Sequence, residues 1–138
     1  MTLSDLLTGG CACGAVRYEI SEPLSSASYC HCTRCQRRTG TAASPQARVV
    51  PGSLRWVKGE DNIGAWTPPD GFAKAFCKSC GGQLYSFDPA DPETTIAVRL
   101  GTFDGDPGVR PERRNRVETA AVWEPIPDDG LPRFESPR

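Results

Sequence analysis

Seven cysteines gathered in three short clusters constrain this chain more than any other feature of its sequence. The clusters are Cys11 and Cys13, then Cys30, Cys32 and Cys35, then Cys77 and Cys80. A closed structural zinc site takes four protein ligands, whereas a catalytic zinc takes three and leaves one position for water or substrate. Seven divides into four plus three, so the sequence predicts two zinc ions per chain, one structural and one working.

Composition indicates one small domain rich in β-structure. The 138 residues are 38% hydrophobic, which suffices for one modest core and not for two. Thirteen prolines and fourteen glycines leave few stretches for an uninterrupted helix, because proline lacks a backbone donor and clashes with the preceding turn. We therefore expect a single domain over 1–138, with an ordered core of about 8–134, built mainly of short antiparallel sheets around zinc sites.

Alternation of apolar and polar residues predicts seven short strands. In Ala15–Ile20, for example, Val16, Tyr18 and Ile20 share one face and charged residues occupy the other. The other strands are expected at 47–50, 54–58, 73–76, 83–87, 94–100 and 117–123, separated by proline and glycine turns. Residues 34–40, after the second cluster, are the expected short helix, with Gly40 at its end.

Charge and terminal sequence argue against nucleic acid and membranes as partners. The formal net charge is −1, and thiolates on zinc would make it more negative, so the broad basic field that such partners need is missing. Residues 1–8 carry no basic leader, and no segment approaches the roughly 20 apolar residues of a membrane span. We expect a cytoplasmic protein, because a reducing compartment favours metal ligation by clustered thiols over disulfides.

The first and third clusters are expected to share the structural zinc. On an extended strand Cys11 and Cys13 point to the same face, so a strand edge would present both to one ion. Cys77 and Cys80 have the two-residue spacing of a zinc knuckle, and two glycines follow that can turn the chain. These four ligands would clamp distant parts of the chain together.

The second cluster differs because it has no evident fourth ligand nearby. Cys30, Cys32 and Cys35 can face one ion and leave one coordination position open. Alternation directs His31, the only histidine, away from that ion, so we expect it beside the metal or at the surface rather than as a ligand. Three thiolates favour exchange of a fourth sulfur, so the implied substrate is a thiol activated as thiolate, and these cysteines are the candidate catalytic group.

Five segments also resemble the glutathione-dependent formaldehyde-activating enzyme family, the GFA domain. They are 9–19, 30–40, 76–81, 99–104 and 123–134. The resemblance implies an Mss4-like all-β fold, with structural zinc on the first and third clusters and catalytic zinc on the second. It also implies addition of glutathione, as co-substrate, to formaldehyde, giving S-(hydroxymethyl)glutathione. In reverse this is the reaction of a carbon–sulfur lyase.

One departure from the family pattern concerns binding of the substrate. Where the family often has a His-Ile pair, this chain reads Arg114-Asn115 and lacks that histidine. Arginines are plentiful instead, with four in the stretch 110–116 and three that flank the proposed catalytic zinc, namely Arg34, Arg37 and Arg38. Arginine can bind a carboxylate through two parallel hydrogen bonds and glutathione has two carboxylates, so we expect these last three to anchor glutathione.

Two other interpretations are compatible with the same sequence. A non-enzymatic, zinc-stabilised module could bind protein or nucleic acid, although such a scaffold more often has eight ligands in two closed sites. An enzyme acting on another glutathione adduct would have the same cysteine spacing. Saturable binding of glutathione favours an enzyme, whereas nucleic-acid binding that weakens steeply with salt favours the module.

Overall fold

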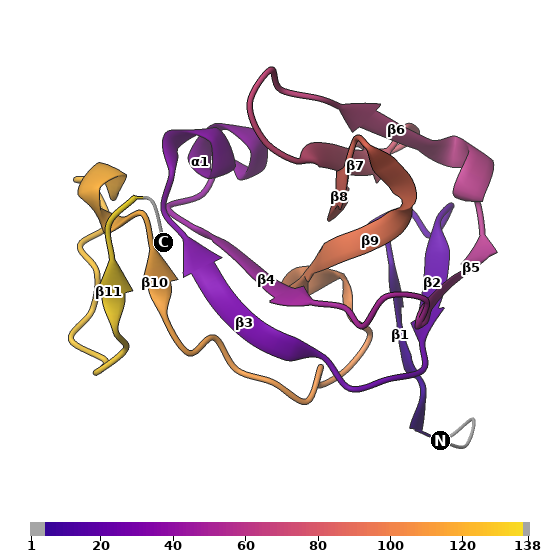
Figure 1. Cartoon of the computed structure of the whole chain (residues 1–138), viewed down its shortest axis with the longest axis horizontal. Helices are drawn as coiled ribbons and strands as arrows, with labels where there is room; N and C mark the ends of the chain where they lie inside the picture. Colours follow the sequence, from indigo (N-terminus) through magenta and orange to yellow (C-terminus); the bar gives the residue numbers. More distant parts are fainter. Residues whose placement is uncertain (1–4, 137–138) are drawn as a thin grey trace.

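Two β-sheets and one short α-helix make up residues 5–136, the part of the chain that the computed structural model describes (Figure 1). The ends of the expected domain, 1–4 and 137–138, lie outside that range. The smaller sheet is antiparallel, with the order β1-β2-β5. Its strands are β1 (Leu7–Gly10), β2 (Arg17–Ile20) and β5 (Leu54–Lys58).

The larger sheet has eight strands in the order β11-β10-β3-β4-β9-β8-β7-β6. They are β3 (Ser25–Cys30), β4 (Ser44–Arg48), β6 (Ile63–Trp66), β7 (Ala73–Cys77), β8 (Gln83–Asp88), β9 (Asp91–Arg99), β10 (Arg114–Asn115) and β11 (Arg133–Phe134). β10 pairs in parallel with β3 and β11, and the other pairs are antiparallel. The fold is mainly β, as the proline and glycine content predicts, and the C-terminal segment docks as an edge strand.

The apolar core lies between the small sheet and one face of the large sheet. Register places Ala47, Val98, Tyr85 and Ala75 side by side across β4, β9, β8 and β7, and each is at most 9% exposed. Trp56 of the small sheet contacts Tyr85, with ring centroids 5.1 Å apart. The two sheets are therefore joined by aromatic packing, which removes much apolar surface from water.

Strand β2 and the residue before it also contribute to this core. Val16, Tyr18 and Ile20 are each at most 1% exposed, so the shared face predicted from alternation is confirmed. The Tyr18 ring also meets Phe103 edge to face, with centroids 5.7 Å apart.

The opposite face of the large sheet is polar. Side chains alternate along a strand, so the residues flanking the core row point the other way. Register aligns two rows on this face: Ser28, Gln46 and Arg99, and then Arg48, Ala97, Ser86 and Lys74. This polar face forms the floor of the cavity described below.

Helix α1 (Thr33–Thr39) begins within the second cysteine cluster, includes Cys35, and confirms the short helix predicted there. Cys32 is its N-cap residue, and its Sγ accepts a hydrogen bond from the backbone N–H of Cys35 at 3.2 Å. Gly40 ends the helix in the left-handed region, with φ 68°, a conformation that glycine adopts without steric cost.

The strand predicted at 117–123 is wrong. Its residues form the short 3-10 helix η4 (Val117–Thr119) and then irregular chain, in which Trp123 is 65% exposed. Arg116 precedes η4 with φ 58°, which interrupts an extended path. Two further 3-10 turns are η2 (Glu60–Asn62) and η3 (Leu100–Thr102).

Five strands lie outside the predicted ranges, namely the two-residue strands β10 and β11 and three longer strands with weak sequence signals. β1 ends in two glycines, β3 is rich in serine, and β6 contains a glycine. These residues have low strand propensity, so pairing with neighbouring strands decides their conformation.

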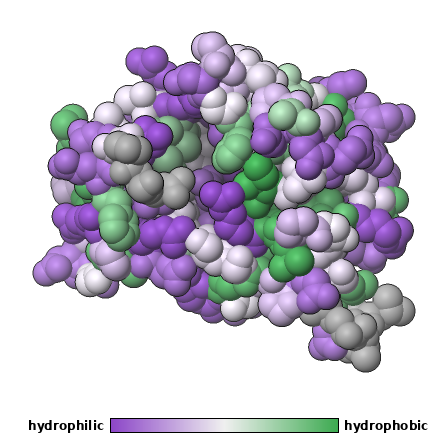
Figure 2. Space-filling model, viewed as in Figure 1, coloured by the Kyte–Doolittle hydropathy of each residue, from purple (hydrophilic) through white to green (hydrophobic). Residues whose placement is uncertain are grey.

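The surface is largely polar on the face shown in Figure 2, where hydrophobic residues gather near the centre. Within residues 5–136, no helix has the length and apolar content to cross a membrane.

Candidate functional site

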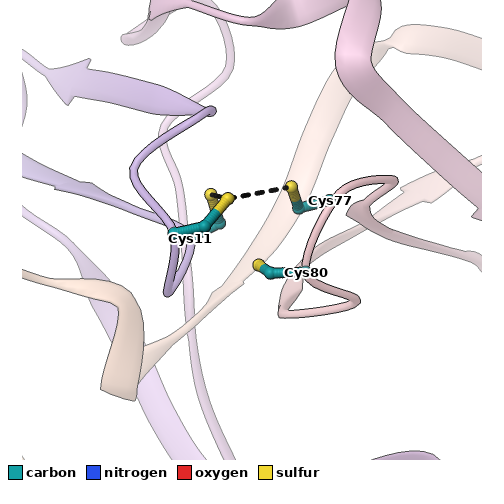
Figure 3. A group of neighbouring side chains, drawn as sticks. Cys11, Cys77 and Cys80 are labelled. Carbon is teal, nitrogen blue, oxygen red and sulfur yellow. Dashed lines mark hydrogen bonds between the residues drawn. The ribbon is translucent and has the colours of Figure 1, made fainter.

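The first and third cysteine clusters meet where two turns approach each other (Figure 3). All four Sγ atoms, from Cys11, Cys13, Cys77 and Cys80, lie within 4.8 Å of one another. The Sγ atoms are 3.7 Å apart for Cys11 and Cys13 and 3.9 Å apart for Cys13 and Cys77. Tetrahedral zinc with bonds of about 2.3 Å requires sulfurs about 3.8 Å apart, so this group fits a zinc ion with four thiolates.

Local geometry in the first cluster differs from the extended strand edge predicted from the sequence. Residues 11–14 form a turn in which the Gly14 N–H donates to the Cys11 carbonyl at 3.3 Å. The turn also brings the N–H of Val16 to 3.2 Å from Cys11 Sγ. The third cluster is the expected knuckle, because Gly81, with φ 75°, turns the chain and donates to the Cys77 carbonyl at 2.8 Å.

Hydrogen-bond donors surround these four sulfurs. Backbone N–H groups, of Gly82 first and then of Cys13, lower the pKa of Cys80 to about 6. The Asn62 side-chain amide lies 3.5 Å from Cys77 Sγ. Donors directed at sulfur favour the thiolate, which is the form that binds a metal ion. The group is thus suited to hold an ion and to join the β1 turn to the β7 turn.

Cys30, Cys32 and Cys35 form the second group, with all three Sγ atoms within 4.8 Å of one another. Cys30 ends β3, Cys32 caps α1, and Cys35 lies in the first turn of α1. Among residues 5–136, no fourth cysteine, histidine or carboxylate joins this group at that distance. Three ligands from one short segment fit an ion that keeps an open position.

The three thiols do not ionise equally. Hydrogen bonds with Cys30 and then Cys35 lower the pKa of Cys32. The pKa values of the other two are raised, by the hydrogen bond with Cys32 for Cys30 and by the hydrogen bond with Cys30 for Cys35. One thiolate opposes ionisation of its neighbours because like charges repel. A divalent ion removes that opposition, so the donor set fits zinc on chemical grounds as well.

His31 lies between two of these cysteines and outside their group. It is 3% exposed, which excludes the surface position and leaves the expected position beside the cysteine group. Its Nε2 is 3.2 Å from Nη1 of Arg114. Arginine can only donate, so Nε2 accepts and a neutral ring carries its proton on Nδ1. Burial, and then the charges of Arg114 and Arg133, lower the pKa of His31.

Arg114 ties the C-terminal segment to the back of the cysteine loop. Its guanidinium lies 4.4 Å from the centre of the Tyr29 ring and 2.8 Å from Asp129, and it lowers the pKa of that carboxyl. The N–H of His31 donates to the Asn115 carbonyl at 2.9 Å. Arg114 and Asn115 therefore hold His31 and Tyr29, the two residues on either side of Cys30, in place.

A cavity of about 400 Å³ lies beside the three thiols, a size typical of small-molecule sites. Its lining includes the polar sheet face, α1, the loop between β6 and β7, and residues before η4. The basic lining residues are Arg34, Arg48, Lys74, Arg113 and Arg116, and the one carboxylate among the lining residues is Asp70. Five cations against one carboxylate, in a chain of net charge −1, favour an anionic ligand.

The three arginines singled out from the sequence occupy different positions. Arg34 lines the cavity, but its guanidinium holds Asp70 through hydrogen bonds to Oδ1 (2.7 Å) and the carbonyl (2.9 Å). Arg37 is exposed and is not among the lining residues. Arg38 is half-buried, donates to Gln83, and is not among the lining residues either.

Sequence reasoning missed Arg48 and Lys74. Lys74 alternates with the buried Ala73 and Ala75, so it faces away from the core, and this isolated charge in an apolar strand was a usable signal. Only register reveals that Arg48 shares its row.

Backbone strain also marks this cavity. Ser26 and Arg116 are the non-glycine residues with positive φ that the structure describes, and both line it. Residues held in this region cluster at functional sites, where surrounding contacts maintain them.

Comparison with known proteins identifies the family. The model of the family described as "Glutathione-dependent formaldehyde-activating enzyme" matches residues 6–119. The chain belongs to the glutathione-dependent formaldehyde-activating enzyme family. A Halomonas elongata protein named "Putative glutathione-dependent formaldehyde-activating enzyme" is 29% identical over 116 residues, covering 78% of this chain and 72% of that protein.

A solved structure has a similar fold. It is the crystal structure of a Rhodobacter sphaeroides protein, with 25% sequence identity and a TM-score of 0.54. The match covers 92% of this chain and 98% of the other. The family match spans both cysteine groups, so each belongs to the part of this chain that resembles the glutathione-dependent formaldehyde-activating enzymes.

Proposed function

We propose that this protein is a zinc-dependent enzyme that joins or releases glutathione and formaldehyde as S-(hydroxymethyl)glutathione, with carbon–sulfur lyase chemistry in the reverse direction. The observation that carries the proposal is an incomplete set of three thiols beside a basic cavity. Family membership supports glutathione and formaldehyde as the small-molecule partners. The same chemistry requires reduced thiols, so we also propose a cytoplasmic location.

Two zinc ions with different duties are part of this proposal. Cys11, Cys13, Cys77 and Cys80 would hold a structural ion, and Cys30, Cys32 and Cys35 a catalytic one. The chemistry supplied by zinc at the second group is ionisation of an incoming thiol at neutral pH. The chain's own residues would then bind the rest of glutathione, hold it beside the three thiols, and donate or remove the proton that the reaction requires.

Anionic groups of glutathione are the expected ligands of the cavity cations. Arg116 is the best placed anchor, because it lines the cavity and donates to the Ser136 hydroxyl with no carboxylate partner in residues 5–136. Arg113 already pairs with Glu112 and Arg34 with Asp70. A substrate carboxylate that binds Arg34 must therefore replace or share the contact with Asp70. Of the three arginines expected from sequence, we retain Arg34.

The proton requires a donor in the cavity. When the thiolate sulfur bonds to the carbonyl carbon, the C=O electron pair moves to oxygen, which must take up a proton. Arginine keeps its proton in proteins, and Asp70 is held by Arg34. Lys74 also lines the cavity, and burial lowers its pKa toward the range useful for proton transfer. We propose that Lys74 donates this proton and removes it in the reverse reaction.

The deciding experiment combines zinc analysis with the rate of exchange between free glutathione and its hydroxymethyl adduct. The uncatalysed reaction also proceeds, so exchange-detected NMR with and without protein isolates the enzymatic part. We expect two zinc ions per chain, acceleration by the parent protein, and loss of acceleration with Arg116→Ala at low glutathione. Arg37→Ala removes the same charge from an exposed position and is the matched control. No acceleration by a protein holding two zinc ions would refute the proposed reaction.

Two other functions are less well supported. A purely structural module has no evident use for an incomplete thiol group beside a basic cavity. An enzyme for a different glutathione adduct would bind glutathione equally well, and it would be favoured if glutathione saturates the cavity without accelerating formaldehyde exchange.

A further inference from the structure

Two of the residues with unpartnered buried polar atoms flank Cys30 of the three-cysteine group, and the third lies one strand further away. In residues 5–136 such side-chain atoms belong to Ser44, Arg99 and Asn115. Ser44 on β4 and Asn115 on β10 are the register partners of Cys30 on its two sides. Arg99 lies on β9 next to β4, in the polar row with Gln46. Buried polar atoms without partners are rare in folded proteins, so their presence here requires a physical reason.

Arg99 is the most demanding of these residues because it carries charge. It is 6% exposed, and its Nη2 donates to Ser86 Oγ at 2.8 Å, whereas Nε and Nη1 have no partner. No carboxylate forms an ion pair with it in the described part of the chain. A buried cation without a counter-charge is strongly unfavourable, so an anion must lie within electrostatic reach.

Two neighbouring cations are also partly buried and have no carboxylate partner among residues 5–136. Arg38 donates to the neutral side chain of Gln83, and Lys74 has no ion pair among residues 5–136. Burial lowers the pKa of Arg99, Arg38 and Lys74, and negative charge on Cys35 opposes that effect at each of them. Register supports the same assignment, because Arg99 shares a row with Ser28, which lies two residues before Cys30 on the same face of β3. The sulfur group can therefore serve as the anion for these cations.

We propose that Arg99, supported by Arg38 and Lys74, is the buried counter-charge that stabilises the three-cysteine group in its fully ionised, metal-holding form. Three thiolates and one divalent ion sum to −1, and an anionic substrate thiol would increase that negative charge. Such charge in a half-buried cavity requires cations nearby, and Arg99 keeps its charge throughout, whereas Lys74 carries charge until it donates its proton. This inference rests on the proposed function, because it assigns Arg99 to the same centre. Arg99 is a positioning residue that acts through the thiolates.

Zinc affinity in variants of Arg99 provides the test. Competition against a chromophoric chelator resolves a tightly held and a labile zinc in the two-zinc protein. We expect Arg99→Met to lower the affinity for the labile zinc about 10- to 100-fold, as loss of a residue that supports a metal ligand does in other proteins. The affinity for the tightly held zinc should not change. Arg99→Lys keeps the charge and should stay within about threefold of the parent. The control, Arg37→Met, removes an exposed arginine and should change neither ion.

A second measurement needs no variant and covers the case in which Arg99→Met does not fold. The Nε–H resonance of Arg99 should shift when the second equivalent of zinc is added and stay fixed during the first. If the parent protein binds only one zinc ion, the proposed function itself is refuted. Two zinc ions with an unmoved Arg99 resonance, unchanged affinity in Arg99→Met, or equal losses in the Lys and Met variants would overturn this inference alone.

Discussion

The two cysteine groups of this protein use the same ligand atom in opposite surroundings. The four-thiol group joins two turns far apart in the sequence and receives backbone and amide donors. The three-thiol group comes from one short segment and lies beside a basic cavity, with buried cations nearby. Ligand number and surroundings, rather than ligand type, separate a group suited to hold the fold from one suited to react.

The largest effect should come from breaking the four-thiol group. Cys80→Ala leaves three ligands for an ion whose binding is coupled to folding, a contribution on the order of 10 kcal/mol in small zinc domains. We expect loss of the cooperative thermal transition seen by circular dichroism, together with aggregation. A soluble Cys80→Ala protein with the parental melting temperature would show that this group is not the clamp of the fold.

Breaking the three-thiol group should spare the fold. Cys32→Ala removes one ligand and the acceptor that caps α1, a loss of about 1 kcal/mol from the cap. We expect one zinc per chain instead of two, no thiol-dependent activity, and a cooperative transition close to that of the parent. The measurements are metal analysis, exchange NMR and thermal denaturation. Retention of both zinc ions with full activity would contradict the distinction between the groups.

Lys74 tests whether the cavity transfers a proton or only supplies charge. Lys74→Met and Lys74→Arg should both reduce kcat, by about 100-fold, because arginine keeps the charge without releasing a proton. Steady-state kinetics across pH should show an ionisation in the parent that both variants lack. Full activity in Lys74→Arg would reduce the role of Lys74 to electrostatics.

A smaller effect is expected from Arg114, which supports the three-thiol loop from behind. Arg114→Met removes its contacts with His31 and Asp129, at a cost of about 2 kcal/mol for hydrogen bonds that involve charged groups. We expect lower stability in urea denaturation and weaker binding of the labile zinc alone. Equally weaker binding of both zinc ions would indicate a general loss of structure. Arg55→Met, at an exposed ion pair, is the control.

The smallest effect concerns the apolar face that backs the cavity. Burial raises the pKa of Tyr85 to about 12, from an ordinary value of 10. The unfolded chain ionises this group first, so its contribution to stability is complete below pH 10 and is lost as pH rises towards 12. We expect a loss of about 1 kcal/mol at pH 11 that Tyr85→Phe abolishes. Ultraviolet titration of tyrosine at pH 10 to 11 would contradict the prediction if Tyr85 ionised normally.

Local signals in the sequence predicted much of this molecule. Alternation placed Val16, Tyr18 and Ile20 on one buried face, and Gly40 marked the end of α1. Signals failed where the decisive contacts are distant: β3 is serine-rich and becomes a strand because β4 and β10 pair with it. The expected strand at 117–123 failed because Arg116 turns the chain and Trp123 has no core to enter.

The candidate site divides in the same way. Spacing alone gave three cysteine clusters, because residues two or three positions apart must lie close together whatever the fold. The pairing of the first cluster with the third was predicted from the number of zinc ligands, and only the folded chain brings those four sulfurs together. The arginines beside the second cluster were predicted as one set, yet Arg34 lines the cavity while Arg37 and Arg38 do not. Position in sequence cannot tell which side of a short helix faces a cavity formed by other strands.

By itself, then, the sequence determined the three cysteine clusters, the β-rich class and the family resemblance, since each depends on residue types or on short spacings. Tertiary structure alone decided the cation set. Arg48, Lys74 and Arg99 come from three different strands, and only the register of β4, β7, β8 and β9 brings them to the polar face beside the three thiols. Electrostatic interactions depend on distance in space, and no local pattern encodes that distance.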